Sequence, residues 1–139
     1  MIPPVLIFFS WANKYYKDRG NQEFLKWIES TIKDTFDFTK EKISSKYDSI
    51  VEFELYNNDY FKEKYLKEIF ADSLGYAGTE IIRRVVGDSK VMEITSVDDN
   101  DIRVSMERAL IKMGISLIMN RYDFSSGKEI TREFKLILS

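Results

Sequence analysis

Apolar residues recur at steps of three and four along most of this chain, and that spacing limits the fold more than any other feature. Three stretches carry it, with the apolar residues Phe24, Trp27, Ile28, Ile32 and Phe36, then Tyr65, Leu66, Ile69, Phe70 and Leu74, then Ile102, Met106, Leu110, Met113 and Leu117. Because an α-helix has 3.6 residues per turn, each set lies on one helical face. We therefore predict an all-α protein of about five helices.

Residues with capping chemistry mark where these helices begin and end. Asn21 is a suitable N-cap for a helix that runs to about residue 46, and the cluster 57–59 precedes a helix that begins near Tyr60. The acidic run 98–101 provides an N-cap for a helix that ends near residues 120–121. A last helix or strand is expected after the turn at residues 125–127.

The segment 51–56 alternates apolar and polar residues, as a strand does. The sequence shows no second strand with which it would pair. We therefore expect an extended connector or an irregular helix end at this position.

The N-terminal apolar run, residues 4–12, is well short of the ~20 residues that a membrane-spanning helix needs. No positive side chain precedes it, as would be typical of a signal peptide. We expect a core helix that ends in the polar stretch 14–19 and stops at Gly20. This interpretation, together with the lack of cysteine, favours a cytoplasmic protein without a membrane partner.

Composition excludes several kinds of chemistry. The 139 residues contain no cysteine and no histidine, so disulfides, thiol nucleophiles, Cys/His zinc sites and histidine acid–base catalysis are excluded. There are 21 Lys and Arg against 23 Asp and Glu, a net charge of −2 with no long basic run, so nucleic acid is not an expected partner. The length suits a single helical domain over residues 1–139.

Glycines interrupt the helix predicted from Tyr60. Gly75 and Gly78 each cost about 1 kcal/mol relative to alanine in a helix interior. Such glycines mark a break, or a close approach of another backbone or a ligand. Gly87 then fits the C-cap position.

Three short polar motifs resemble ligand sites without the required context. Residues 98–101 suggest calcium, but the central glycine of an EF-hand loop is missing, which favours helix capping. Residues 123–125 resemble the metal-binding tripeptide of protein kinases, and residues 125–128 resemble a phosphate loop. Neither has the surrounding motifs of those sites, so an ordinary polar turn is favoured and no metal site is expected.

Arg83 and Arg84 are the candidate binding residues. Successive helical residues point ~100° apart, but the long side chains let both guanidinium groups converge on one anion. Glu80 lies three and four residues earlier, which favours the alternative of an intrahelical ion pair on a solvated face. The apolar neighbours at 81–82 and 85–86, after two glycines, favour an anion-binding role instead.

The segment 70–87 resembles the C-terminal signature of 5-methylthioribose kinases, in which an Asp-x-x-Gly-Phe-Ala-Gly run leads to twin arginines and a glycine. Here that run is Asp72-Ser73-Leu74-Gly75-Tyr76-Ala77-Gly78, with tyrosine in place of the usual phenylalanine. The match extends forward to Arg121 and, more weakly, back to Phe8. The resemblance implies a dimeric, protein-kinase-like enzyme of methionine salvage that uses ATP and magnesium to phosphorylate methylthioribose at its anomeric hydroxyl. It also implies that Arg83 and Arg84 bind the sugar.

The sequence also departs from the family pattern. In the family, the nucleotide-binding lobe, the catalytic aspartate and the metal-holding carboxylates would all precede Met1, so no catalytic residue and no cofactor are assigned to this chain. The run Met1-Ile2-Pro3-Pro4 replaces a Gly-Phe-Asp-x-Gly run. We therefore interpret the chain as the helical C-lobe portion of such a kinase. We leave open whether it takes part in catalysis, and we expect it to be inactive alone.

Two further expectations follow from this interpretation. Helices that would pack on the missing lobes should expose an apolar face, at residues 4–12 and 74–77, and should associate with those lobes or with a second copy. The alternative function is a non-catalytic helical interaction or dimerisation module that binds through the same face. A membrane-surface protein that uses residues 4–11 is a third hypothesis, which sparse flanking basic residues disfavour.

Overall fold

The computed structural model describes residues 5–139, and the regular structure in that range is entirely helical. In chain order the elements are α1 (Leu6–Lys17), α2 (Gln22–Ile50), the 3₁₀ helix η1 (Glu54–Tyr56), α3 (Asp59–Val86), α4 (Met92–Thr95), α5 (Asn100–Met119) and α6 (Gly127–Leu138). The all-α prediction is therefore confirmed. The four-residue α4 was not predicted, because one helical turn is too short to show a periodic pattern.

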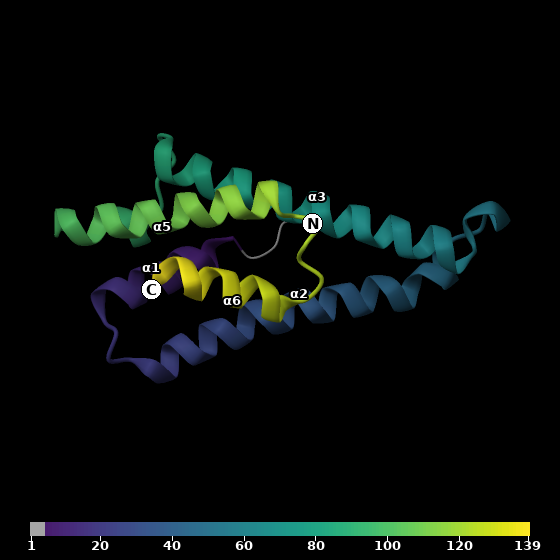
Figure 1. Ribbon diagram of the computed structural model, residues 1–139, viewed down its shortest axis with the longest axis horizontal. Coiled ribbons are helices and arrows are strands. Elements are labelled where there is room, and N and C mark those ends of the chain that lie inside the picture. The colour runs from purple at the N-terminus through teal and green to yellow at the C-terminus, as the bar shows by residue number, and fades with distance from the viewer. Residues whose placement is uncertain (1–4) are drawn as a thin grey trace.

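The helices form an elongated bundle (Figure 1). α3 packs most extensively against α5 on one side, and α2 packs against α6 on the other. α1 contacts both α5 and α2, so it joins the two sides. α2 and α3 extend beyond the shorter helices and meet again at the connector that contains η1. The bundle therefore has a six-helix body and a projecting two-helix end.

Asn21, Asp99 and Gly87 cap helices as predicted, whereas α1 ends at Lys17 with Asp18, not Gly20, as its C-cap. The Asn21 side chain accepts a hydrogen bond from the Phe24 N–H at 3.1 Å and begins α2. The Asp99 side chain accepts from the Ile102 N–H at 3.0 Å and begins α5. Gly87 is the C-cap of α3. Each cap satisfies backbone groups that a helix end leaves without a partner.

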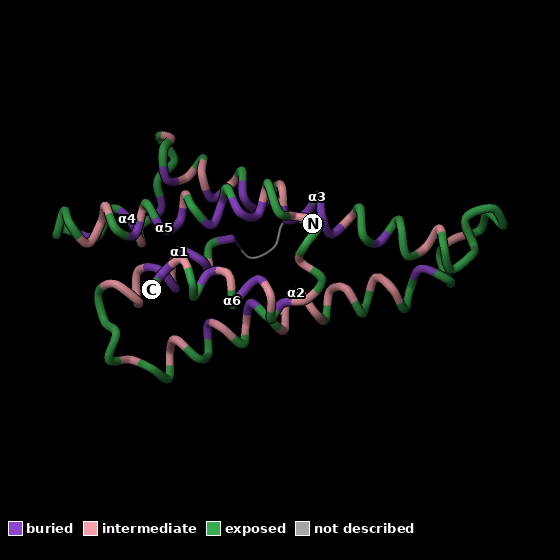
Figure 2. The backbone as a smooth tube through the Cα atoms, viewed as in Figure 1, coloured by how far each residue is buried: buried purple, intermediate pink, exposed green. Residues whose placement is uncertain are grey.

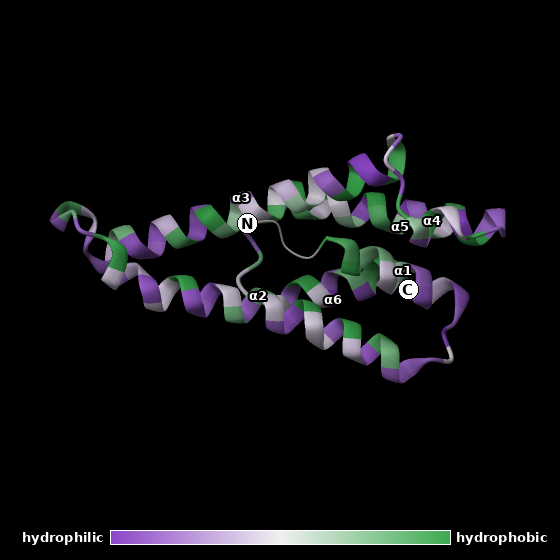
Figure 3. Ribbon diagram, turned by 180° about the vertical axis from the view of Figure 1, so that it is seen from behind, coloured by the Kyte–Doolittle hydropathy of each residue, from purple (hydrophilic) through white to green (hydrophobic). Residues whose placement is uncertain are grey.

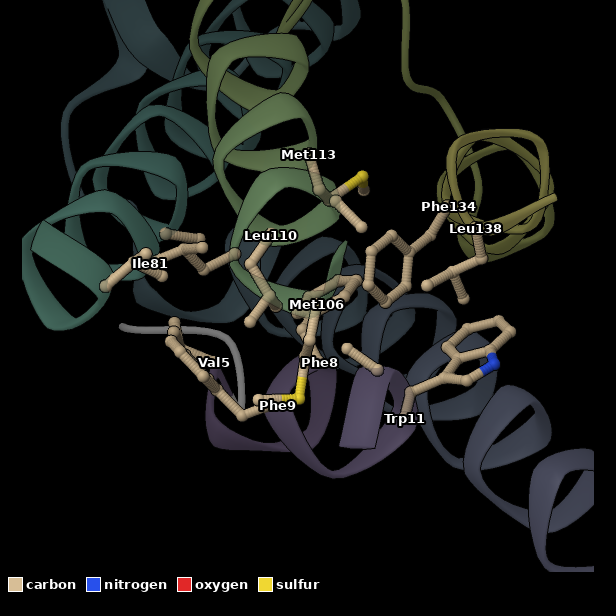
Figure 4. Close-up of a cluster of buried hydrophobic side chains, with 14 of the residues drawn as sticks. Val5, Phe8, Phe9, Trp11, Ile81, Met106, Leu110, Met113, Phe134 and Leu138 are labelled. Carbon is tan, nitrogen blue, oxygen red and sulfur yellow. The ribbon is translucent and has the colours of Figure 1, made fainter. Parts of the chain in front are cut away.

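The core lies where α1, α5 and α6 meet (Figure 4). The Phe134 ring of α6 is 5.3 Å from the Phe8 ring and 5.3 Å from the Trp11 ring, in both cases edge to face. Met106 and Leu110 of α5 are fully buried beside them. Phe134 is itself completely buried, so α6 closes the core over α1.

The expectation that residues 4–12 and 74–77 expose an apolar face is wrong. Phe9 and Ala12 of α1 are completely buried, because α5 and α2 of the same chain pack against this helix and Phe134 of α6 contacts its Phe8 and Trp11 rings. Leu74 and Ala77 belong to the same core cluster, and each is at most 2% exposed. In the 74–77 segment, Tyr76 alone is largely exposed. Residue 4 lies outside the described residues.

The projecting end is the most exposed part of the molecule (Figure 2). From the last turns of α2 through the first turns of α3, most residues are exposed, whereas buried residues concentrate in the six-helix body. Several of these exposed residues are apolar, including Ile50, Phe53 and Leu55. Figure 3 shows that hydrophobic and hydrophilic residues alternate over this end of the molecule. None of the described helices is both long and apolar enough to cross a bilayer.

The segment 51–56 is a connector, as predicted. Residues 51–53 lack regular structure, and residues 54–56 form η1. The Tyr47 hydroxyl donates a hydrogen bond to the Tyr56 carbonyl oxygen at 2.8 Å, which ties the connector to α2.

Candidate functional site

Arg83 and Arg84 lie in the last turn of α3, directly before the Gly87 C-cap. Cationic side chains in this position interact favourably with the negative end of the helix dipole. The Arg83 side chain is 53% exposed and the Arg84 side chain is 30% exposed. Both guanidinium groups are therefore accessible from solvent.

Glu80 brings the two guanidinium groups together. Arg83 donates from Nε to Glu80 Oε2 and from Nη2 to Glu80 Oε1, each at 2.8 Å. Arg84 donates from Nε to Glu80 Oε1 at 2.6 Å. One carboxylate therefore orients both arginines, and the intrahelical ion pair that the sequence offered as an alternative is present.

These contacts strongly perturb Glu80. Hydrogen bonds from Arg83 and then from Arg84 favour its ionised form and lower its pKa from 4.5 to about 2. The same contacts raise the Arg83 pKa. Glu80 and Arg83 therefore remain charged throughout the physiological pH range.

The opposite face of this part of α3 is buried. Ile81 is completely buried and Val85 is 3% exposed, both in the core cluster. The apolar neighbours that the sequence placed beside the arginines thus mostly point away from them. They hold α3 rigidly in the bundle, so the arginine pair is mounted on a fixed helix.

The glycines before the arginines do not break the helix, because α3 continues from Asp59 to Val86. Gly78 instead allows α5 to approach closely. A Cβ on Gly78 would overlap the carbonyl oxygen of Gly114 and lie 2.8 Å from Ile118 Cγ1. Gly75 is different, because a Cβ there would meet Arg121 Cδ at an ordinary 3.5 Å. Of the predicted alternatives, Gly78 therefore marks the approach of another backbone.

The acidic run 98–101 caps a helix, as predicted. The Asp99 side chain accepts hydrogen bonds from two backbone N–H groups, that of Ile102 at 3.0 Å and that of Asp101 at 2.9 Å. Within the described residues, no group of three or more acidic side chains is placed to hold a metal ion.

The turn at residues 123–128 is also structural. Ser126 and Glu129 form a capping box at the start of α6. The Glu129 carboxylate accepts hydrogen bonds from the backbone N–H and the hydroxyl of Ser125 and from the backbone N–H of Ser126. These hydrogen bonds lower the pKa of Glu129. The Gly127 N–H donates to Asp37 Oδ1 at 2.8 Å and fastens the turn to α2. The polar-turn prediction is confirmed.

Sequence reasoning missed a pocket between α2 and α3 at the projecting end. It has a volume of about 540 Å³ and is lined mainly by apolar and aromatic side chains. The available signal was the number of tyrosines and phenylalanines near the connector, but periodicity alone does not show that two helices leave a space between them.

Comparison with known proteins supports the resemblance inferred from the sequence. The chain is 26% identical over 137 residues to methylthioribose kinase 2 of Oryza sativa subsp. japonica, which covers 91% of this chain and 32% of the rice protein. It is 38% identical over 72 residues to the methylthioribose kinase of Geobacillus sp. (strain WCH70), and 44% identical over 59 residues to that of Erwinia tasmaniensis. These alignments cover 52% and 42% of this chain.

The similarity to methylthioribose kinases expected from the sequence is therefore confirmed. No family model matches the chain. The chain spans about a third or less of the relatives named above, since the matches cover 32%, 18% and 15% of their lengths.

Proposed function

We propose that this chain forms the sugar-side helical part of a methylthioribose kinase-like phosphotransferase, in which Arg83 and Arg84 contact the sugar or the phosphoryl group that passes to it. The observation that carries the proposal is the convergence of the two guanidinium groups on Glu80, within a segment that resembles the family signature. The similarity to proteins named methylthioribose kinase supports the substrate class. The proposal implies a cytoplasmic protein of methionine salvage.

Glu80 orients the arginines without using all of their donors. A guanidinium group has five N–H donors. Arg84 donates one of them to Glu80, so four remain, and Arg83 donates two, so three remain. The remaining donors are available to hydroxyl or phosphoryl oxygens, and their positive charge stabilises negative charge that develops during phosphoryl transfer. Arg83 and Arg84 thus act by binding and charge stabilisation.

ATP and magnesium chemistry is proposed to come from polypeptide other than these 139 residues, either the remaining kinase lobes or a partner that supplies them. Phosphoryl transfer depends on positioning the two reactants, and the helical body contributes a sugar-side surface alone. The 139-residue chain is expected to form no methylthioribose 1-phosphate when mixed with ATP, magnesium and methylthioribose. Turnover above background would contradict the proposal that other polypeptide supplies the ATP and magnesium chemistry.

Sugar binding is the direct test. Titration of methylthioribose and of methylthioribose 1-phosphate into the chain, followed by calorimetry, should show binding that Arg83→Ala plus Arg84→Ala weakens at least tenfold, because charged hydrogen bonds are lost. The matched control is Arg108→Ala plus Arg132→Ala, which removes two exposed arginines elsewhere. The proposal would be contradicted if both double variants lost affinity equally. It would also be contradicted if the parent chain bound neither methylthioribose nor methylthioribose 1-phosphate.

A non-catalytic interaction or dimerisation module remains the second candidate. The observation that favours it is the exposed apolar surface of the projecting end, where Phe53 is 63% exposed and Leu55 is 67% exposed. Size-exclusion chromatography with light scattering distinguishes the two. A stable homodimer that binds neither sugar ligand would favour the module.

A further inference from the structure

The pocket at the projecting end has a continuous aromatic wall. The Tyr56 and Phe61 rings are 4.6 Å apart, the Phe61 and Tyr65 rings are stacked at 6.3 Å, and the Tyr65 and Tyr47 rings are 5.7 Å apart. The aliphatic side of the pocket comes from Ile43, Ile50, Val51 and Ile69. Its volume of about 540 Å³ falls in the range of small-molecule sites.

The wall is held in place by contacts outside the pocket's open side. Tyr47 is 5% exposed, and its hydroxyl donates to the Tyr56 carbonyl oxygen. Lys62 pairs with Asp48 at 2.8 Å and lies over the Tyr47 ring, with its Nζ 5.8 Å from the centroid. The connector is thereby tied to α2, and α3 is tied to α2, so the pocket is largely preformed.

Two lysines give the pocket a positive edge. Lys42 and Lys46 both line it, and they are one helical turn apart on α2. Both are exposed, and neither forms an ion pair among the described residues. Lys62, by contrast, is already neutralised by Asp48. The pocket therefore combines apolar walls with two ammonium groups that lack a counter-ion.

We propose that this pocket binds a small amphiphilic carboxylate, with an aromatic or aliphatic body between α2 and α3 and its carboxylate at Lys42 and Lys46. Apolar surface buried against Tyr65 and Ile69 supplies affinity, and the lysines select a negative charge. The site is distinct from the arginine pair, because Arg83 lies 14 positions after Ile69 on α3, about 21 Å further along the helix. The proposal does not depend on the proposed kinase function.

The first test uses 2-naphthoate as the probe and 2-naphthalenemethanol as its uncharged analogue. Titrations of the ¹⁵N-labelled 139-residue chain should give saturable amide shifts confined to residues 42–69, with several-fold tighter binding of naphthoate. Shifts centred on α1, α5 or α6, or no saturation, would overturn the proposal.

Variants then separate charge from shape. Lys42→Gln plus Lys46→Gln should weaken naphthoate binding about fivefold and leave the alcohol unchanged, since two exposed charge contacts are lost. The matched control, Lys64→Gln plus Lys67→Gln, removes two exposed lysines of the same end that do not line the pocket, and should change neither affinity. Tyr65→Ala should weaken both probes about fivefold by removing part of the aromatic wall.

Other results would overturn the assignment. If Lys42→Gln plus Lys46→Gln weakened the binding of both probes equally, the lysines would not select for the negative charge of the ligand. Weakening by the control pair would show non-specific attraction. If the chain dimerised through residues 42–69 and naphthoate failed to compete, a second copy of the chain would be the occupant instead.

Discussion

The two halves of α3 pack against very different neighbours. The C-terminal half lies against α5, with Gly78 and Gly114 where the two helices cross. Its inward-facing side chains are no more than a few per cent exposed. The N-terminal half faces α2 across the pocket, and Tyr60 and Tyr65 remain 79% and 45% exposed. One continuous helix thus passes from a close-packed crossing to an open aromatic surface.

This difference separates the region that holds the fold together, the α3–α5 crossing, from a region with exposed surface, the projecting end. Small residues at the crossing let two backbones touch, so neighbouring side chains of α3 and α5 interlock. Large aromatic residues at the projecting end keep α2 and α3 apart, so a pocket remains between them. Stability should therefore depend on the six-helix body, and binding of the proposed amphiphilic carboxylate on the projecting end.

The largest expected effect is in the core. Phe134→Ala should lower the free energy of unfolding by about 4 kcal/mol, because it leaves a cavity between Phe8 and Trp11. Phe53→Ala, at a ring that is 63% exposed on the projecting end, should change it by less than about 0.5 kcal/mol. Urea denaturation followed by far-UV circular dichroism measures both. Similar losses in the two variants would remove the distinction between the regions.

The helix crossing is the next most sensitive position. Gly78→Ala should cost about 3 kcal/mol, because the new methyl group overlaps backbone atoms of Gly114, which have no rotamer to change. The same substitution one turn earlier is the matched control. Gly75→Ala should stabilise the protein by about 0.5 kcal/mol, since its methyl group makes an ordinary contact and alanine favours the helix. A stabilising Gly78→Ala would contradict the close approach.

A smaller effect is expected at the base of the projecting end. Tyr47→Phe removes the hydroxyl that donates to the Tyr56 carbonyl oxygen, at a cost of about 1 kcal/mol. Amide exchange should accelerate in the connector, residues 51–58, and remain unchanged at the α3–α5 crossing. Faster exchange throughout the chain would show that the two regions unfold together.

Much of the fold could be predicted from local patterns. The apolar spacing located the long helices, and Asn21 and Asp99 cap them as their side-chain chemistry requires. The apolar run of α1 indicated a core helix, but the helices that cover it could not be predicted in this way. The helix that α1 contacts most, α5, begins more than 80 residues later in the chain, and a local pattern does not show which apolar faces meet.

The candidate site was predictable to a similar depth. The spacing of Glu80, Arg83 and Arg84 allowed both an ion pair and convergence of the arginines, and the structure has the two together on one carboxylate. The role of Gly78 required knowledge of Gly114, which approaches from another helix. The sugar-binding role of the arginines stays a prediction.

The smallest stability effect is expected from Glu80, on the solvated face of the well-packed half of α3. Its pKa is lowered from 4.5 to about 2 by Arg83 and Arg84. Above pH 4.5 its pairing stabilises the fold in full; as the pH falls from 4.5 towards 2, the unfolded chain gains a proton that the folded state does not, so this stability is lost. The difference in urea midpoint between the parent chain and Glu80→Gln should therefore be present at pH 6 and shrink by pH 2.5. Glu63→Gln controls for loss of one exposed carboxylate without an ion pair among the described residues. A Glu80→Gln difference that did not change with pH would mean that the lost stability does not come from the carboxylate charge of Glu80.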